Sequence, residues 1–324
     1  MTRGALVLRM VLALLACAVC ATGTALLAAA AVGTARGQRL DQLILTAARH
    51  DTSALTRIVF PALNTVTVPV VVVALVVAAV VALVQRRTSM ALHLIVLVAG
   101  AIATTEVLKH LVVTRSALAA DIDLTPNSFP SGHTTTAGAV AVAVTLASPR
   151  QVRSVVALVG AAWTAMAGIG TVAGGWHRPS DVLGALLVVG AWTFLVLAVD
   201  AAMAIVRTAR DGAGRDDDRA GAEGPAAGER PARPVLPVHR GARAAIVVLG
   251  LAAVAGLALG AVLLAGVPTP LDLTDGAAQA RAYRASMLLL AGASSALVGG
   301  TLALHVPAVP RRAVPRRGDP IRVR

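Results

Sequence analysis

The sequence predicts an all-α integral membrane protein of about eight spans, in which a six-helix core is followed by two further C-terminal helices. Of its 324 residues, 57% are hydrophobic and only 14% are charged, whereas soluble domains average about 25% charged residues. The mean hydropathy is +0.78, and several apolar runs approach or exceed the ~20 residues that a helix needs to cross a bilayer. A soluble two-layered core is the alternative, and this composition disfavours it.

Eight apolar runs are the expected spans. In chain order they cover residues 10–32, 58–84, 90–113, 132–147, 155–172, 181–206, 244–267 and 285–306. The first run exceeds the ~7–15 apolar residues of a signal peptide, so we expect an uncleaved anchor, with cleavage after its Ala-rich end as the alternative. Pro61 and Pro69 should bend or delay the start of the second span.

Composition divides the chain into four parts. Residues 1–206 hold six spans, and within them residues 33–57 are polar enough to lie outside the membrane. Residues 207–243 are rich in Arg, Asp, Gly, Ala and Pro, which predicts a flexible cytoplasmic linker. A two-span hairpin over residues 244–310 follows, and residues 311–324 form a basic cytoplasmic tail. We assign no role to the hairpin or the linker from sequence.

The net charge of +13 indicates topology rather than nucleic-acid binding. The Arg residues lie in short loops and tails, and most of the 29 Lys and Arg residues fall on one side of the membrane if the N-terminus is cytoplasmic. Both termini are therefore expected in the cytoplasm of a cell-membrane protein. Aromatic residues make up 2% of the chain, too few for nucleic-acid stacking. Cys17 and Cys20 lie in the first apolar run and should be free thiols.

One polar stretch between two apolar runs, Pro130 to His133, reads PSGH. Ser131 is a favourable N-cap, and Gly132 lets a ligand approach the backbone closely. The free N–H groups and the positive dipole end of such a helix start attract anions. His133 is then placed to exchange a proton with the anion. The bland alternative is a capped helix with an incidental histidine.

A second polar cluster, Glu106, Lys109 and Arg115, lies at the end of the third predicted span. Lys109 is the only lysine of the chain. It could simply extend to the membrane interface, but with Arg115 it could also hold phosphate oxygens. Glu106, three residues before Lys109, should pair with it on one helix face.

A third cluster, WHRPSD, carries His177 and Asp181 four residues apart at a helix start. The carboxylate can accept the imidazole Nδ1–H, which leaves Nε2 as a nucleophile. The alternative is a capping Asp beside an interfacial His. With the predicted orientation, all three clusters lie on the extracytoplasmic side, where together they suggest a phosphoryl-transfer site. A metal site is disfavoured, although Asp121 and Asp123 stay open as ligands.

These clusters, in this order, resemble the type 2 phosphatidic acid phosphatase family, which shares its site with vanadium haloperoxidases. The resemblance covers roughly residues 90–206 and is complete at PSGH and at His177-x-x-x-Asp181. It implies a six-helix phosphatase-like bundle, no cofactor or metal, and a phosphohistidine intermediate. By matching position, His177 is the nucleophile, Asp181 its orienter and His133 the general acid. The resemblance also implies that Ser131 and Gly132 bind phosphate.

The sequence departs from the family pattern in two motifs. Five residues instead of six separate Lys109 from Arg115, and Ser116 replaces the usual Pro. The Arg expected six residues before His177 falls on Thr171, which removes a bidentate phosphate ligand. We still expect Lys109 and Arg115 to bind phosphate, and we expect Arg178, or Arg115 alone, to supply the charge of the missing Arg.

The expected function is a membrane phosphatase acting on a lipid phosphate or diphosphate at the outer leaflet. Phosphatidate, phosphatidylglycerol phosphate and polyprenyl diphosphate all suit a polar head group at the membrane surface with a tail in lipid. Membrane lipids are the only other expected partners. A non-catalytic lipid-phosphate binder or transporter is the alternative, which the missing Arg favours. A haloperoxidase is a third reading, which the membrane spans disfavour.

Overall fold

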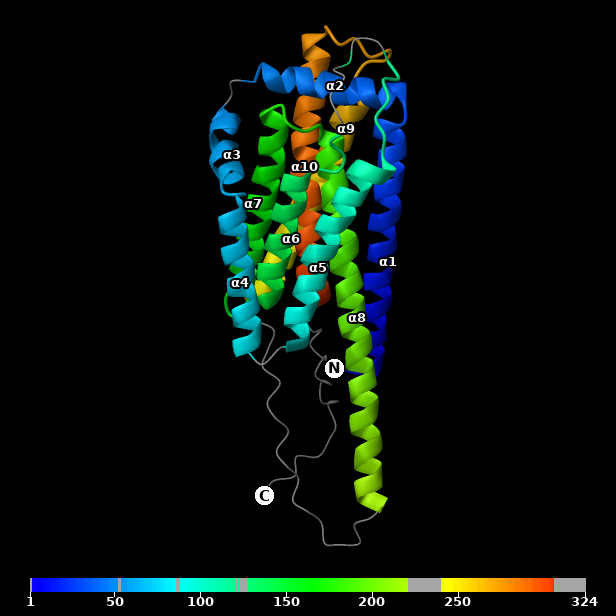
Figure 1. The fold of residues 1–324 in the computed structure, drawn as a ribbon, viewed down its shortest axis with the longest axis vertical. Coiled ribbons are helices and arrows are strands. Elements are labelled where there is room, and N and C mark those ends of the chain that lie inside the picture. Colours follow the sequence, from blue (N-terminus) through cyan, green and yellow to red (C-terminus); the bar gives the residue numbers. More distant parts are fainter. Residues whose placement is uncertain are drawn as a thin grey trace, which may run out of the picture.

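The computed structural model describes residues 2–51, 54–85, 88–119, 122, 127–220 and 240–305, and these residues form helices and loops with no strand. The helices are α1 (Arg3–Leu27), α2 (Ala35–Arg49), α3 (Ala54–Asn64), α4 (Val68–Val84), α5 (Thr88–Val107), α6 (Gly132–Ala147), α7 (Arg153–Ala173), α8 (Pro179–Ala220), α9 (Arg240–Ala265) and α10 (Gly276–His305). α1 and α5 continue into the π-helical turns Ala28–Val32 and Leu108–Val112. The long helices run along one axis, and α2 lies across one end, here called the α2 end (Figure 1).

Six helices in the described part of the chain are long and apolar enough to cross a membrane, and the bent pair α3–α4 makes a seventh. The pair meets at 67°, with Pro61 inside α3 and Pro69 in the first turn of α4, so the bend expected in the second span is present. The expected fourth span, α6, has 16 residues, fewer than the ~20 that a helix needs to cross a bilayer by itself. Pro130 and Pro149 flank this helix and limit its length.

α6 lies inside the bundle, where it packs against α4, α5, α7, α8 and α10. Most of its residues are buried, and many are Ala, Gly or Thr. Small side chains allow helices to approach closely, which is how membrane helices associate in the absence of water. Large apolar side chains remain exposed on the outer faces of other helices, among them Leu15 on α1, Val73 on α4, Ile95 on α5 and Val254 on α9. The outer surface thus suits contact with lipid.

α2 is an amphipathic helix that lies across one end of the bundle (Figure 1). Sequence placed residues 33–57 outside the membrane but predicted no helix there. Thr34 caps the helix by accepting from the Gly37 N–H, and Leu43 and Ile44 are buried against α7, α8 and α10. Its polar residues Gln38 and Asp41 are also buried. α2 therefore delivers polar groups to the end of the bundle.

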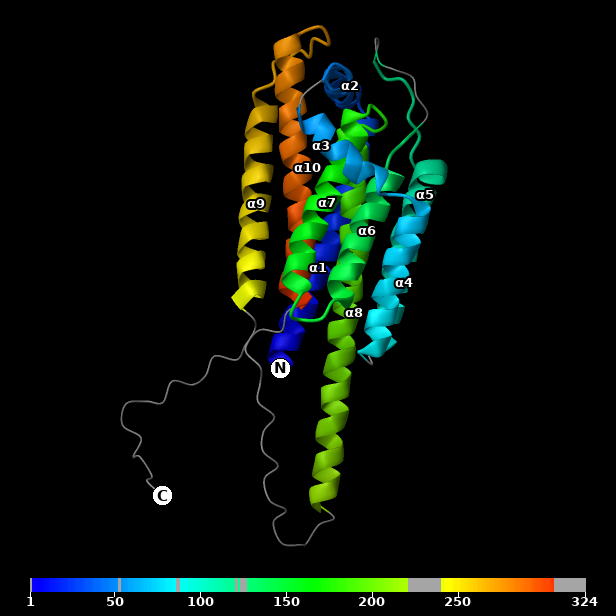
Figure 2. The ribbon, with the colours of Figure 1, turned by 90° about the vertical axis from the view of Figure 1, so that its left-hand side faces the viewer.

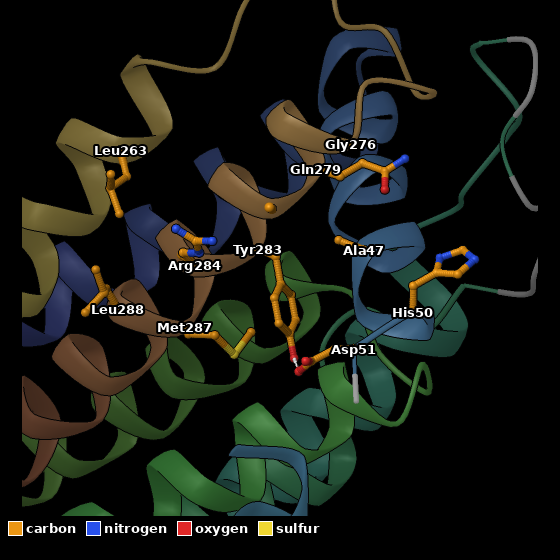
Figure 3. Close-up of a pocket in the computed structure, with 11 residues that line it drawn as sticks. Ala47, His50, Asp51, Leu263, Gly276, Gln279, Tyr283, Arg284, Met287 and Leu288 are labelled. Atoms are coloured by element: carbon orange, nitrogen blue, oxygen red, sulfur yellow. Dashed lines mark hydrogen bonds between the residues drawn. The ribbon is translucent and has the colours of Figure 1, made fainter. Parts of the chain in front are cut away.

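The C-terminal pair α9–α10 is integrated into the bundle rather than appended to it. Figure 2 shows the pair on one side of the molecule, with α4 and α5 on the opposite side, and α10 packs against α2, α6, α7 and α8. Leu297 of α10 belongs to the main hydrophobic core. At the α2 end, the Tyr283 hydroxyl donates to Asp51 Oδ2 at 2.9 Å beside an apolar pocket of about 680 Å³ (Figure 3). Arg39 of α2 also donates to the Leu271 carbonyl at 3.2 Å.

The structure differs from the sequence prediction at the start of the linker that was expected over residues 207–243. α8 continues to Ala220, beyond the predicted span end at residue 206. Residues 207–220 contain no Pro to end the helix, although they include as many Asp as Arg residues and two Gly. The predicted linker is thus helical up to that point. Residues 221–239 and the expected tail 311–324 lie outside the described residues. Both cysteines are free, as expected.

Candidate active site

A cavity of about 490 Å³ lies between the α3–α4 bend, α5, the start of α6 and the loop before α8. Its charged and titratable lining residues are Glu106, Lys109, His133 and His177. Apolar side chains from the α3–α4 bend, α4 and α5 form much of the remainder: Val66, Val68, Val71, Val72 and Ile102. The three polar clusters found in the sequence therefore contribute to one cavity, with an apolar wall beside them.

The start of α6 is a capped helix N-terminus that lies next to Lys109. Ser131 is the N-cap, and its hydroxyl accepts from the Thr134 N–H at 3.4 Å. A Cβ on Gly132 would lie 3.4 Å from Lys109 Nζ, so the ammonium group lies directly over the first turn. Glu106 accepts from Lys109 at 3.1 Å, as expected for an i,i+3 pair. Cationic charge and free N–H groups thus meet at one point.

The two histidines approach each other across the cavity. The ring centroids of His133 and His177 are 6.1 Å apart, with an angle of 64° between the ring planes. The ring of Trp176 lies 5.8 Å from that of His133 and restricts its orientation from the side. Two imidazoles at this separation can both lie next to one phosphoryl group, on different sides of its phosphorus atom.

The loop that carries His177 is shaped by the end of α7. Gly175 has a φ of +69°, a left-handed conformation that glycine adopts without steric cost. The chain then folds back, so that the Trp176 and His177 N–H groups donate to the Thr171 carbonyl at 2.9 and 3.1 Å. Thr171 itself is fully buried. The position where the family pattern has Arg therefore holds the histidine loop through its backbone.

Asp181 is fully buried behind His177. Its Oδ2 accepts from the Ser128 hydroxyl at 2.6 Å and from the Arg178 N–H at 3.0 Å, and it lies 3.5 Å from His177 Nδ1. The predicted pairing of imidazole and carboxylate is present at ion-pairing distance. Catalytic hydrogen bonds are often long in ligand-free sites and shorten when substrate binds.

Three residues expected to bind phosphate lie outside the cavity lining. Ser131 is fully buried as the cap of α6. Arg115 contacts carboxylates: its guanidinium lies 3.4 Å from Asp181 Oδ1 and 3.7 Å from Asp41 Oδ2. Arg178 is buried with 5% exposure. Lys109 is consequently the cation that the structure places in the cavity, within its described lining.

Asp41 is a buried site residue that sequence reasoning missed. It comes from α2, and its Oδ2 accepts from the Ser180 hydroxyl at 2.5 Å. Burial, followed by the nearby charge of Asp181, raises the pKa of Asp41 to about 6. The apolar residues Leu43 and Ile44 give α2 an amphipathic pattern that sequence analysis could have found. Nothing in the sequence pairs Asp41 with residues beyond position 110.

The described residues contain no group of three or more His, Cys, Asp or Glu side chains arranged to hold a metal ion. Asp121 and Asp123, which the sequence left open as ligands, lie outside the described residues.

Residues 89–203 match the family model described as the PAP2 superfamily. This segment belongs to that superfamily. The PAP2 segment comprises nearly all of α5, all of α6 and α7, and most of α8. It contains Lys109 and both cavity histidines, whereas α2, α9 and α10 lie outside it. No curated protein and no solved structure matches the chain.

The family assignment and the helices together define a multi-pass membrane protein with a phosphatase-type fold. Members of the PAP2 superfamily generally hydrolyse phosphate esters. The PAP2 segment supplies the charged and titratable residues of the cavity, and the α3–α4 bend and α4 complete its apolar wall from outside the segment.

Proposed function

We propose that this protein is a membrane phosphatase that hydrolyses a lipid phosphate or diphosphate through a phosphohistidine intermediate. The observation that carries the proposal is a cavity with two histidines and a lysine at one side and a row of valines from α4 at another. A head group suits the polar side, and an acyl or prenyl chain suits the apolar side. Phosphatidate, phosphatidylglycerol phosphate and polyprenyl diphosphate are the candidate substrates.

The first chemical step transfers the phosphoryl group to His177. Asp181 orients the imidazole so that Nε2 attacks phosphorus, forming a P–N bond as the P–O bond to the lipid breaks. His133 gives its proton to the departing oxygen. Lys109 and the N–H groups of the first turn of α6 stabilise the charge on the equatorial oxygens.

The second step releases inorganic phosphate. His133, now neutral, takes a proton from water, and the hydroxide oxygen forms a bond to phosphorus as the P–N bond breaks. His177 returns to its starting state, so no metal or redox partner enters the balance.

The proposed location is the extracytoplasmic face of the cell membrane. α2 lies across one end of the bundle, and the N-terminus lies at the opposite end (Figure 1). The cavity is lined by the start of α6 and the loop before α8, toward the α2 end. The bias of Lys and Arg that the sequence predicts for the loops and tails on the N-terminal side favours a cytoplasmic position for that end.

The test measures phosphate release by purified protein in detergent with EDTA, across the three substrate classes. We expect wild-type activity to survive EDTA and the His177→Ala variant to lose at least ~1,000-fold in kcat. His50→Ala is the matched control, since His50 is at the end of α2 and does not line the cavity. Activity in the control with none in His177→Ala supports the proposal.

A lipid-phosphate binder or transporter is the second candidate, favoured by the engagement of Arg115 with two carboxylates. It predicts saturable binding of a lipid phosphate with no phosphate release above that of His177→Ala. Binding without phosphate release would refute the phosphatase proposal in favour of a binder or transporter.

A further inference from the structure

We propose that Asp41 of α2, outside the PAP2 segment, is a positioning residue for the histidine nucleophile and acts through Arg115 and Asp181. The inference rests on the proposed function for its catalytic consequence, but the arrangement itself is a property of the described side chains. It gives α2 a role in the chemistry of a site whose polar residues otherwise come from the PAP2 segment.

The geometry forms a continuous chain of contacts. Asp41 is 4% exposed and lies 3.7 Å from Arg115. The same guanidinium lies 3.4 Å from Asp181 Oδ1, and the other oxygen of Asp181 lies 3.5 Å from His177 Nδ1. One buried cation therefore lies between two carboxylates, only one of which contacts the nucleophile.

Two sets of contacts fix the position of Asp41: hydrogen bonds to its side chain from α8, and hydrogen bonds that join α2 to the C-terminal pair. Ser180, at the start of α8, donates its hydroxyl to Asp41 at 2.5 Å and its N–H at 3.4 Å. The contacts of Tyr283 with Asp51 and of Arg39 with the Leu271 carbonyl join α2 to the C-terminal pair. The side chain of Asp41 is thereby fixed relative to the histidine loop.

The electrostatic consequence has a definite sign. The charged groups near Asp41 are Arg115, Arg178 and Asp181. Those near His177 are Asp181 and His133, with Lys109 and Glu106 in the same cavity. While Asp41 is ionised, its negative charge offsets part of the positive charge of Arg115. Arg115 then neutralises less of the Asp181 carboxylate, which stabilises the imidazolium of His177 more strongly. Without that charge, Arg115 pairs with Asp181 alone, and the imidazolium of His177 is less stabilised.

The Asp41→Asn variant should fold. Since burial raises the pKa of Asp41 to about 6, the group binds protons more tightly when folded than when unfolded. Its ionisation therefore lowers stability progressively between about pH 4 and pH 6. Asn removes this cost above pH 6, and its Oδ1 can still accept from the Ser180 hydroxyl. We expect an unfolding midpoint equal to or above that of the wild type at pH 7.

The experiment compares Asp41→Asn with Asp272→Asn, which removes an exposed carboxylate in the α9–α10 loop. We expect Asp41→Asn to lower kcat roughly tenfold, less than the ~100-fold that a 1 Å misplacement can cost, with KM unchanged. The acidic limb of kcat/KM should move to lower pH, because the nucleophile is then deprotonated more easily. A purely structural role would lower activity without moving that limb.

A second measurement does not depend on turnover. In full-length protein with ¹⁵N-labelled histidine, the His177 signals, assigned with His177→Ala, should titrate at lower pH in Asp41→Asn than in the wild type or Asp272→Asn. Unchanged titration overturns the inference, even if the protein hydrolyses lipid phosphates. Displaced titration without phosphate release from the wild type would support the positioning and refute the proposed function.

Discussion

Lys109 is the residue on which the proposed binding of phosphate in this cavity would depend most directly. Its amine lies over Gly132 at the first turn of α6 and pairs with Glu106. The other cations assigned to phosphate by sequence, Arg115 and Arg178, are not among the cavity's lining residues. In the described structure, the loss of Lys109 would leave the helix N-terminus as the main positive feature beside the histidines.

Lys109→Met should therefore reduce kcat/KM by roughly 100-fold, the cost of removing one stabilising donor from a transition state. The charge is needed most when the phosphoryl group is in transfer, so kcat should fall more than KM rises. Steady-state phosphate release, measured beside Lys109→Arg, tests this. Partial recovery by Arg is expected, and equal activity of all three proteins would show that Lys109 does not contact the reacting group.

At the scale of elements, the pairing of α9 with α10 depends on close backbone contact at glycines. A Cβ on Gly256 would lie 2.7 Å from the Leu288 carbonyl oxygen and 2.8 Å from the Gly292 Cα. Small residues at such crossings let the two backbones approach closely, and the resulting van der Waals contact stabilises the pairing of membrane helices. This contact holds α9 against α10, and α10 in turn supports α2.

Gly256→Ala should lower the unfolding free energy by about 1–3 kcal/mol, because the added methyl group forces the backbones apart. Gly250→Ala is the control on the same helix, where an added Cβ meets nothing within 4 Å. It should leave stability unchanged or raise it by up to ~1 kcal/mol through helix propensity. Thermal unfolding in detergent measures both, and equal midpoints would contradict the close-contact interpretation.

At the scale of the whole molecule, the two ends of the helical bundle carry different segments of the chain. α2 and the α9–α10 loop lie at one end, and the N-terminus lies at the other (Figures 1 and 2). The cavity is lined by the start of α6 and the loop before α8, toward the α2 end. The charge bias then predicts that the α2 end faces outward.

Paired Gly→Cys substitutions on the C-terminal hairpin test this orientation. Gly276 begins α10 at the α2 end, and Gly241 lies at the start of α9 at the opposite end. In a Cys17→Ala/Cys20→Ala background, a membrane-impermeant maleimide should label Gly276→Cys in intact cells and Gly241→Cys only after permeabilisation. The reverse pattern would place the cavity in the cytoplasm.

The sequence alone determined the helical membrane class and the local chemistry, because both depend on residues that are close together in the chain. Apolar run length predicts spans, and the four-residue offset of His177 and Asp181 brings them together at a helix start. The N-cap role of Ser131 and the pairing of Lys109 with Glu106 are local for the same reason.

Only the tertiary structure decided which charges face the cavity. Asp41 and Ser180 are 139 positions apart, and no short-range pattern relates them. The burial of Arg115 between two carboxylates depends on how α2 packs across the bundle, as does the raised pKa of Asp41. The short length of α6 and the integration of α10 likewise follow from packing among helices, which hydropathy along the chain does not encode.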